Sequence, residues 1–343
     1  MARRFVVMTN LAAGVAGLPV LGETQLRGLV PMTAAIVALE AALYDGTAPG
    51  ATPARTSVLT QAGQMLLMPA ATSRFVGIKL VTIAPDNPAI GRPRIQGVYV
   101  LLDAVGLSPV AIVDGVALTS LRTPATSAVA IRRLAVKGAV RLVVIGTGPQ
   151  GYGHIEAVQA VRPVSHLTVV GRDRSRAEAM AVWAARQGLT VEVVAGADLA
   201  DGLEEPVRAA DVVVCATTAH DPVIRGEWLK NEAVVVAIGS HEPDAREVDS
   251  ATVLRSLVVV ETRETALREG GDLLIPIRDG ECGPEVITGD LAQLVKGHLK
   301  LDDPRPRLFK GCGEAWQDLV VASAAFDRME SAHTPPFGTR TGW

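Results

Sequence analysis

The sequence predicts an α/β protein, with a Rossmann-type doubly wound parallel sheet joined to a discontinuous α+β domain. Two observations lead to this class. Residues 140–262 alternate short strands with helices, and the strands are apolar throughout rather than at every second position. Such strands are typical of a parallel sheet covered by helices on both faces. The first 120 residues instead contain short strands separated by Pro and Gly, which are typical of antiparallel hairpins.

The elements of the second half follow from local signals. Short β-branched runs that end at glycine or a polar residue predict strands. Pro149 suits the first turn of a helix, and Gly188 suits the position after a helix end. We expect helices over 149–161 and 174–187, and strands over 141–146, 166–171, 190–194, 211–215, 233–238 and 256–261.

The elements of the first half are less regular. Thr123 and Pro124 resemble a helix cap and a first-turn proline, so we expect a helix from there to about residue 136. An amphipathic helix over 314–329 is expected to pack back on the N-terminal domain. The other expected elements are a helix over 32–44, a strand over 75–83, a proline-stiffened loop over 85–93, and a hairpin of strands 97–102 and 109–113.

Composition narrows the class of protein. At about 150 residues per domain, 343 residues correspond to about two domains. The chain is 48% hydrophobic but only 3% aromatic, which predicts an aliphatic core. A net charge of −3 argues against nucleic-acid binding. We expect no membrane span, no signal peptide in the short apolar start at residues 1–8, and a cytoplasmic protein whose three cysteines form no metal site.

A glycine-rich turn follows one predicted strand and opens the next helix. Its first glycine allows a tight turn, the second lets a pyrophosphate approach the backbone, and the third lets helix and strand pack closely. The helix N-terminus then presents free N–H groups to the anion. Within a complete strand–turn–helix–strand unit, this pattern predicts dinucleotide binding. The turn consists of Gly146, Thr147, Gly148, Pro149, Gln150 and Gly151.

The end of the next predicted strand indicates which dinucleotide is bound. An acidic residue there would bind the ribose 2′-hydroxyl of NAD, whereas an arginine accommodates the 2′-phosphate of NADP. In this sequence Gly171 is followed by Arg172 and then Asp173. The sequence therefore favours NADPH. NADH stays open because Asp173 can turn inward, and the alternative interpretation of Arg172 is a solvated arginine at a helix start.

Several further motifs occur in a fixed order, and with them the chain resembles the ornithine cyclodeaminase and mu-crystallin family across nearly its whole length. Because these motifs are independent of one another, the resemblance is specific. They lie at residues 54–56, 78–82, 114–115, 119–123, 146–150, 226–228, 237–239, 243–247, 271–272 and 309–313.

This resemblance implies a domain organisation and a class of chemistry. Residues 125–307 would form the dinucleotide-binding domain, and residues 1–124 and 308–343 a substrate-binding and dimerisation domain whose strands form a homodimer interface. Mu-crystallin-like members are ketimine reductases that use NADPH, whereas others are cyclodeaminases, alanine dehydrogenases or pyrroline-carboxylate reductases. The family also implies nicotinamide-ribose contacts at Thr217 and Thr218. Within matching motifs, Thr123 and Gly239 are assigned to the same cofactor site.

Three cations stand in apolar or small-residue surroundings, where an unpaired charge is costly. Arg55, Lys79 and Arg122 suit binding of an α-carboxylate, which arginine can hold in bidentate fashion. Ordinary surface or salt-bridged cations are the alternative, and the resemblance favours the functional role most clearly for Lys79 and Arg122. We also expect Lys79, as a lysine among cations, to have a depressed pKa and to donate a proton or polarise the imine.

His241 departs from the family pattern. Cyclodeaminases carry an aspartate two positions after the glycine that corresponds to Gly239, where it handles the substrate amine, but this chain has histidine. The departure argues against lyase chemistry unless Glu242 or Asp244 takes over. His241 can supply a proton at neutral pH or be a surface loop residue.

Together these features predict an NAD(P)H-dependent reductase of a cyclic imine carboxylate such as pyrroline- or piperideine-2-carboxylate. Hydride would add to the C=N carbon while Lys79, His241 or water protonates nitrogen. Ornithine cyclodeamination, alanine-dehydrogenase-like amination and non-enzymatic ligand binding of the crystallin kind are the alternatives.

Overall fold

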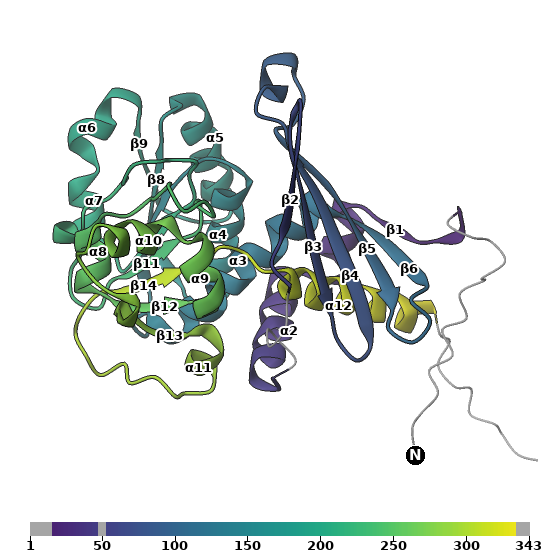
Figure 1. Cartoon of the computed structure of the whole chain (residues 1–343). Helices are drawn as coiled ribbons and strands as arrows, with labels where there is room; N and C mark the ends of the chain where they lie inside the picture. Colours follow the sequence, from purple (N-terminus) through teal and green to yellow (C-terminus); the bar gives the residue numbers. More distant parts are fainter. Residues whose placement is uncertain (1–15, 47–52, 334–343) are drawn as a thin grey trace, which may run out of the picture. The chain divides into compact units, whose positions relative to one another are not determined.

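The computed structural model describes residues 16–46 and 53–333, so the N-terminal start considered above lies outside the described residues. The chain forms two compact units, one of which is built from both ends of the chain (Figure 1). Of the described residues, unit 1 comprises 16–31, 53–119 and 315–333, and unit 2 comprises 32–46 and 120–314. The predicted α/β class with a discontinuous second part is confirmed.

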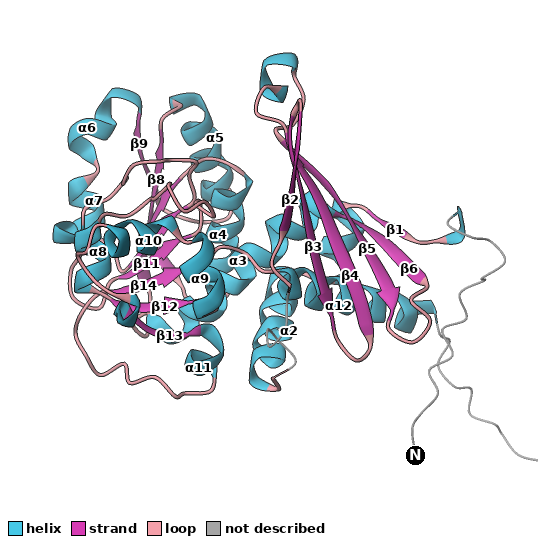
Figure 2. Ribbon diagram, viewed as in Figure 1, coloured by secondary structure: helices cyan, strands magenta, loops and turns pink. Residues whose placement is uncertain are grey.

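Unit 1 is organised around a six-stranded sheet in the order β1-β6-β5-β4-β3-β2 (Figure 2). Neighbouring strands are antiparallel except β1 and β6, which are parallel. The predicted strand at 75–83 and the predicted hairpin are present. The elements of unit 1 are β1 (Val20–Leu21), α1 (Glu23–Leu29), β2 (Thr56–Thr60), β3 (Gly63–Ala71), β4 (Phe75–Ile83), η2 (Asn87–Ile90), β5 (Ile95–Asp103), β6 (Pro109–Asp114) and α12 (Ala315–His333).

Helix α12 covers one face of this sheet, where it packs against β3, β4 and β5. Alternate strand residues are buried on that face, among them Leu66, Lys79 and Tyr99. The period-2 alternation follows from strand geometry, since successive side chains point to opposite faces. The C-terminal helix therefore packs on the N-terminal sheet, as predicted.

Unit 2 contains an eight-stranded, fully parallel sheet in the order β13-β12-β14-β11-β10-β7-β8-β9. Several of its strands are buried at every position, which explains their continuous apolar sequences. The strands are β7 (Val140–Ile145), β8 (Val164–Gly171), β9 (Val191–Ala195), β10 (Val212–Cys215), β11 (Val234–Ala237), β12 (Leu257–Val260), β13 (Ile287–Asp290) and β14 (Arg307–Lys310).

Helices and short 3₁₀ turns connect the strands of unit 2. They are α2 (Met32–Tyr44), α3 (Gly115–Leu134, whose first residues belong to unit 1), α4 (Pro149–Gln159), α5 (Arg174–Ala185), η3 (Gly196–Asp198), α6 (Leu199–Gly202), α7 (Glu204–Ala209), η4 (Gly226–Trp228), α8 (Ser250–Arg255), α9 (Arg263–Glu269), α10 (Gly271–Arg278), η5 (Pro284–Val286) and α11 (Leu291–Val295).

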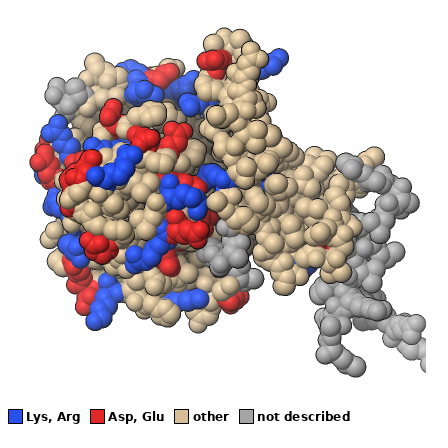
Figure 3. Space-filling model, viewed as in Figure 1, with Lys and Arg blue, Asp and Glu red and all other residues tan. Residues whose placement is uncertain are grey.

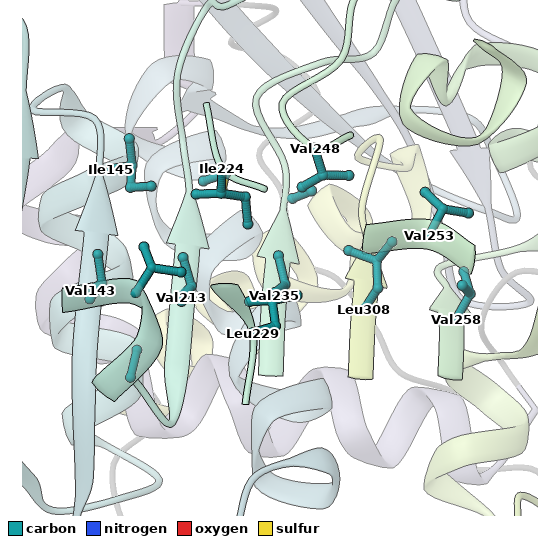
Figure 4. Close-up of a cluster of buried hydrophobic side chains, with 14 of the residues drawn as sticks. Val143, Ile145, Val213, Ile224, Leu229, Val235, Val248, Val253, Val258 and Leu308 are labelled. Atoms are coloured by element: carbon teal, nitrogen blue, oxygen red, sulfur yellow. The ribbon is translucent and has the colours of Figure 1, made fainter. Parts of the chain in front are cut away.

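An aliphatic core fills unit 2. Figure 4 shows how Val143, Val213, Val235, Leu308 and Val258 project from neighbouring strands into one buried cluster. Burying one such side chain fully contributes about 1.5–3 kcal/mol. The prediction of a core that is poor in aromatics is therefore confirmed for this cluster, in which the only aromatic neighbour, among the described residues, is the half-buried Trp228.

The predicted start of one helix is wrong. Helix α3 begins at Gly115, and Pro124 lies inside it rather than in its first turn. Asp114 acts as the cap instead, because its Oδ1 accepts the N–H groups of Val116 and Ala117. Thr123 is accordingly an interior residue of α3 and no cap.

Two further findings concern the order of the elements. Strand β14 is the last strand in the sequence of the described residues, yet it lies inside the sheet, between β11 and β12. The domain boundaries that the sequence analysis places after residues 124 and 307 stay predictions, since the structure defines compact units and not functional domains. The units of the structure instead change at Thr119 and Glu314, and α2 belongs to unit 2.

Within the described ranges, no single helix is long and apolar enough to cross a membrane, although α1 and α2 taken together pass the same test of length and composition. The same ranges contain no group of three or more His, Cys, Asp or Glu side chains arranged to hold a metal ion.

Candidate active site

The glycine-rich turn has the geometry that dinucleotide binding requires. Gly146 has φ +120°, and a Cβ there would lie 2.3 Å from the carbonyl oxygen of Ala216. A Cβ at Gly151 would lie 2.1 Å from the carbonyl oxygen of Gly146. Gly148 precedes Pro149 at the start of α4, with open space in front of its Cα. Two glycines therefore allow close backbone packing, and the third leaves room for an anion at the helix N-terminus.

A cavity of about 480 Å³ opens at the carboxyl ends of β7, β8 and β10. The chain runs from β7 to β8 and β9 on one side and to β10 and β11 on the other, so the cavity lies where the strand order reverses. Ligands of open α/β sheets bind at this position. Seven of the predicted cofactor residues line it: Gly146, Thr147, Gly148, Arg172, Asp173, Thr217 and Thr218.

The structure assigns Asp173 a local role. Its carboxylate caps α5 by accepting the N–H of Arg176 at 3.1 Å, and it lies 3.5 Å from the Arg176 guanidinium. Arg172 and Arg176 both line the same end of the cavity. Two arginines therefore belong to the cavity lining just after β8.

Thr217 lines the opposite end of the cavity, after β10, and its hydroxyl is engaged by protein groups. The carboxylate of Glu247 accepts both the N–H and the hydroxyl of Thr217 at 2.7 Å. Thr217 Oγ1 in turn accepts the N–H of Ala219. The other Glu247 oxygen accepts the N–H of Gly239 at 2.7 Å, so one carboxylate joins the turns after β10 and β11.

Glu247 belongs to a buried charged cluster with Asp272 and Lys310. Asp272 Oδ1 accepts the N–H groups of Glu247 and Val248, and its Oδ2 lies 2.7 Å from Lys310 Nζ. Burial raises the pKa of Glu247, and the charge of Asp272 adds to this effect, while Lys310 and the Thr217 donors oppose it. Burial by itself lowers the pKa of Lys310, but Asp272, acting together with Cys312 and Glu247, holds that pKa above its ordinary value.

In unit 1, Lys79 lies on β4 beneath α12. Its ammonium lies 2.7 Å from the Asp318 carboxylate and donates to Thr119 Oγ1 at 3.1 Å, and both side chains of the ion pair are buried. Helix α12 thus brings a carboxylate to Lys79, a partner that the sequence did not lead us to expect. An opposite charge at this distance favours the charged form of a lysine.

Arg122 lies on α3, three positions after Thr119 and so on the same side of this helix. It is buried, and its guanidinium lies against the backbone of Gly313: a Cβ there would be 2.7 Å from Nη1. Gly313 has φ +78°, and its N–H donates to Glu261 Oε2 at 2.7 Å. The glycine turn after β14 thus provides a flat surface for the guanidinium.

The other predicted site residues occupy varied positions. Arg55 is half-buried immediately before β2, and His241 is half-buried in the loop after β11. Asp244, considered as a substitute for the missing aspartate, is exposed and pairs with Arg278 at 2.6 Å. The cavity lining does not include Thr123, Pro149, Gln150, Gly151 or Gly239.

Sequence reasoning missed the buried acidic partners. Glu247, Asp272, Glu261 and Asp318 are each at most 5% exposed, and each binds backbone N–H groups or a buried lysine of the site. A charged residue is rarely buried without a partner, so Asp272, which stands between Gly271 and Leu273, gave a usable signal in the sequence, whereas Glu247 and Asp318 each follow a polar residue. The spacing along the chain gives no indication of which basic residue each of them meets.

The parallel sheet, the glycine turn and the cavity define a dinucleotide-binding protein of the Rossmann type. The family model of the ornithine cyclodeaminase/mu-crystallin family matches residues 21–333. The chain therefore belongs to this family.

Named relatives agree with the family assignment. A Δ1-pyrroline-2-carboxylate reductase of Bacillus cereus is 33% identical over 90% of this chain and 96% of its own. The ketimine reductase mu-crystallin of Mus musculus is 31% identical over 81% of this chain and 85% of its own. The solved structure of the Thermococcus litoralis Δ1-pyrroline-2-carboxylate reductase, in complex with NADH and L-proline, has a TM-score of 0.84 and 30% identity, and covers 92% of this chain and 98% of that one.

Proposed function

We propose that this protein is an NAD(P)H-dependent imine reductase that converts a cyclic imine carboxylate, such as pyrroline-2-carboxylate, to the cyclic amino acid. The proposal rests mainly on the similarity to two Δ1-pyrroline-2-carboxylate reductases over nine-tenths of the chain. The cavity at the glycine-rich turn, which suits a dinucleotide, supports it. Lys79 and Arg122, which the family resemblance assigns to the substrate, are both buried. They are therefore poor candidates for ordinary surface cations.

The cofactor preference follows from the Arg172 end of the cavity. Asp173 is engaged as the cap of α5, so its carboxylate is turned toward its own helix. Arg172 and Arg176 then supply positive charge for a 2′-phosphate. On this basis the protein prefers NADPH and accepts NADH less well.

The roles proposed for the side chains follow from their chemistry. NAD(P)H, when bound, supplies the hydride that adds to the C=N carbon. Arg122 offers a planar guanidinium that binds the substrate carboxylate in bidentate fashion. The ammonium of Lys79 is a proton donor for the imine nitrogen, and Asp318 favours this charged form. His241 or a water is the second candidate for the proton, and Arg55 an additional cation for the carboxylate.

A substrate panel tests the proposal. The purified protein is expected to oxidise NADPH when pyrroline-2-carboxylate or piperideine-2-carboxylate is added, which is followed by the loss of NADPH absorbance. With NADH the same reaction should be slower. Ornithine with catalytic NAD, and pyruvate with NADH and ammonia, test cyclodeamination and alanine dehydrogenation. Turnover of ornithine to proline and ammonia, without imine reduction, would refute the proposed reaction.

We further propose that unit 1 forms a homodimer through the sheet face opposite α12. Apolar side chains that stay half exposed cover this face, although α12 buries the other one. Figure 3 shows few charged side chains on the visible surface of unit 1 and many on that of unit 2. A broad apolar patch of this kind is typical of an obligate interface. The face includes Met65, Leu67, Ile78, Leu80, Val98 and Val100.

A charge placed on this face is expected to separate the copies. The wild-type protein should have twice the chain mass of 35.9 kDa by light scattering, and Val100→Glu should have the mass of one chain, because dimerisation would bury an unpaired carboxylate from each copy. Val182→Glu, at an exposed apolar residue of α5, should stay dimeric. A monomeric wild-type protein, or a dimeric Val100→Glu variant, contradicts the proposed interface.

A further inference from the structure

Glu247 is a buried acidic residue that binds two loops at the carboxyl ends of the parallel strands. It is fully buried, and its carboxylate accepts three hydrogen bonds at 2.7 Å, two from Thr217 and one from the N–H of Gly239. Gly239 permits this contact, because a Cβ there would lie 2.4 Å from Glu247 Oε1 and 2.1 Å from the carbonyl oxygen of Thr217. The two turns are therefore held at a fixed separation by one side chain.

The position of Glu247 is itself fixed by Asp272 and Lys310. Asp272, at the start of α10, accepts the backbone N–H of Glu247 at 2.6 Å. Lys310, the last residue of β14, pairs with Asp272 and donates to the carbonyl oxygen of Ser240 at 2.6 Å. These bonds connect the carboxyl ends of β10, β11 and β14 into one hydrogen-bonded assembly.

The loop that Glu247 holds forms one end of the cofactor cavity. Arg172 lies at the end suited to the adenosine ribose, so residues 216–219 at the other end face the nicotinamide half of a bound dinucleotide. Thr217 cannot shift without breaking two bonds to Glu247. Residues 216–219 thus form the part of the cavity wall that would contact the nicotinamide ring. Their position depends on Glu247, which does not itself line the cavity.

We propose that Glu247 is a positioning residue for the reaction: it fixes the turns after β10 and β11 and so sets the nicotinamide-binding wall, while making no contact with cofactor or substrate itself. This inference rests on the proposed function for its kinetic part. Displacement of a reacting group by about 1 Å can reduce the rate about 100-fold, whereas binding energy from the adenosine half is unaffected. Loss of Glu247 should therefore lower the rate of hydride transfer much more than the affinity for NADPH.

Glu247→Gln tests this role, because Thr217 and Gly239 donate to different carboxylate oxygens and the NH2 group that replaces one of them cannot accept. Asp249→Ala is the control. Asp249 also accepts three hydrogen bonds, from the N–H of Gly226 and from the N–H and hydroxyl of Thr252, but it caps α8 and does not line the cavity. Glu247→Asp keeps the charge and shortens the reach, so it should fall between wild type and Glu247→Gln.

Three measurements decide the proposal. Single-turnover hydride transfer to pyrroline-2-carboxylate should be at least about tenfold slower in Glu247→Gln, with the NADPH Kd changed less than about threefold. Asp249→Ala should keep both values while its melting temperature falls at least as much as that of Glu247→Gln, because the cap of α8 is lost. Amide hydrogen exchange in residues 216–219 and 239–241 should accelerate in Glu247→Gln only.

The outcomes separate this inference from the proposed reaction. Exchange in the two segments that is as slow in Glu247→Gln as in wild type overturns the role of Glu247, as does a hydride-transfer rate within twofold of wild type. Equal losses of hydride transfer in Asp249→Ala and Glu247→Gln also overturn it, because they indicate a general effect on stability. A wild-type protein that reduces no imine refutes the proposed function, and hydrogen exchange then still tests the loop role.

Discussion

A Lys79→Met variant is expected to lose imine reduction by at least about 100-fold and to be less stable by about 3–5 kcal/mol. The first effect follows because the proposed proton donor is gone. The second follows because the Asp318 carboxylate, fully buried 2.7 Å from Lys79 Nζ, is left without this ammonium. Activity assays with NADPH and chemical unfolding monitored by circular dichroism measure the two effects.

A double variant separates the two effects of this substitution. Lys79→Met/Asp318→Asn removes both charges of the buried pair, so much of the stability should return, while the activity should stay low. Lys230→Met is the control: Lys230 pairs with Asp211 at 2.6 Å but is 40% exposed, and such surface pairs contribute about 0–1 kcal/mol. If the double variant regains wild-type turnover, Lys79 is not the proton donor.

The ion pair of Lys79 and Asp318 shows which part of the site could be predicted from the sequence and which could not. Lys79 was recognisable because a lysine stands in the apolar strand Phe75–Ile83. Its partner was not, because Asp318 lies far away in the sequence and meets it only after α12 packs on the sheet. An aspartate in an amphipathic helix has the same local pattern whether it faces solvent or a buried lysine. The carboxylate beside Lys79 was therefore not predicted.

The parallel sheet was far more predictable. Runs such as Val212–Cys215 and Val234–Ala237 are apolar at every position, and the structure buries all of their residues. Strand β14, in contrast, has Arg307 and Lys310 at its ends, so its sequence lacks this pattern. Its charges are tolerated because each has specific partners: Arg307 donates to the carbonyl of Leu134, and Lys310 pairs with Asp272. Tertiary contacts thus outweigh the unfavourable local sequence.

The misplaced start of α3 has a related cause. A proline in a helix interior leaves one carbonyl without its usual donor and disfavours the helix. In α3 this proline packs closely on Gly153 of α4: a Cβ at Gly153 would lie 2.6 Å from Pro124 Cγ and 3.0 Å from the carbonyl oxygen of Ser120. Helix packing of this closeness requires a glycine on the partner helix. The pairing of these two residues becomes visible only in the folded structure.

Gly313→Ala is expected to raise the KM for the imine carboxylate by about 10- to 100-fold, with the NADPH Kd unchanged. Gly313 has φ +78°, and a Cβ there would lie 2.7 Å from Nη1 and 2.9 Å from Nη2 of Arg122, so the guanidinium must move. Hydrogen bonds to a charged group contribute about 1.5–3 kcal/mol, which corresponds to the expected change in KM. Steady-state kinetics with pyrroline-2-carboxylate measures it.

Backbone strain and displacement of Arg122 can be distinguished by a matched glycine. Gly297 has φ +73° with open space where its Cβ would be, so Gly297→Ala carries a similar strain of about 1–2 kcal/mol but displaces nothing. It should lose stability and keep its KM. A cyclic imine without the carboxylate gives a second comparison, because wild type and Gly313→Ala should then reduce it equally well. A KM that is unchanged in Gly313→Ala would show that the substrate carboxylate does not depend on the position of Arg122.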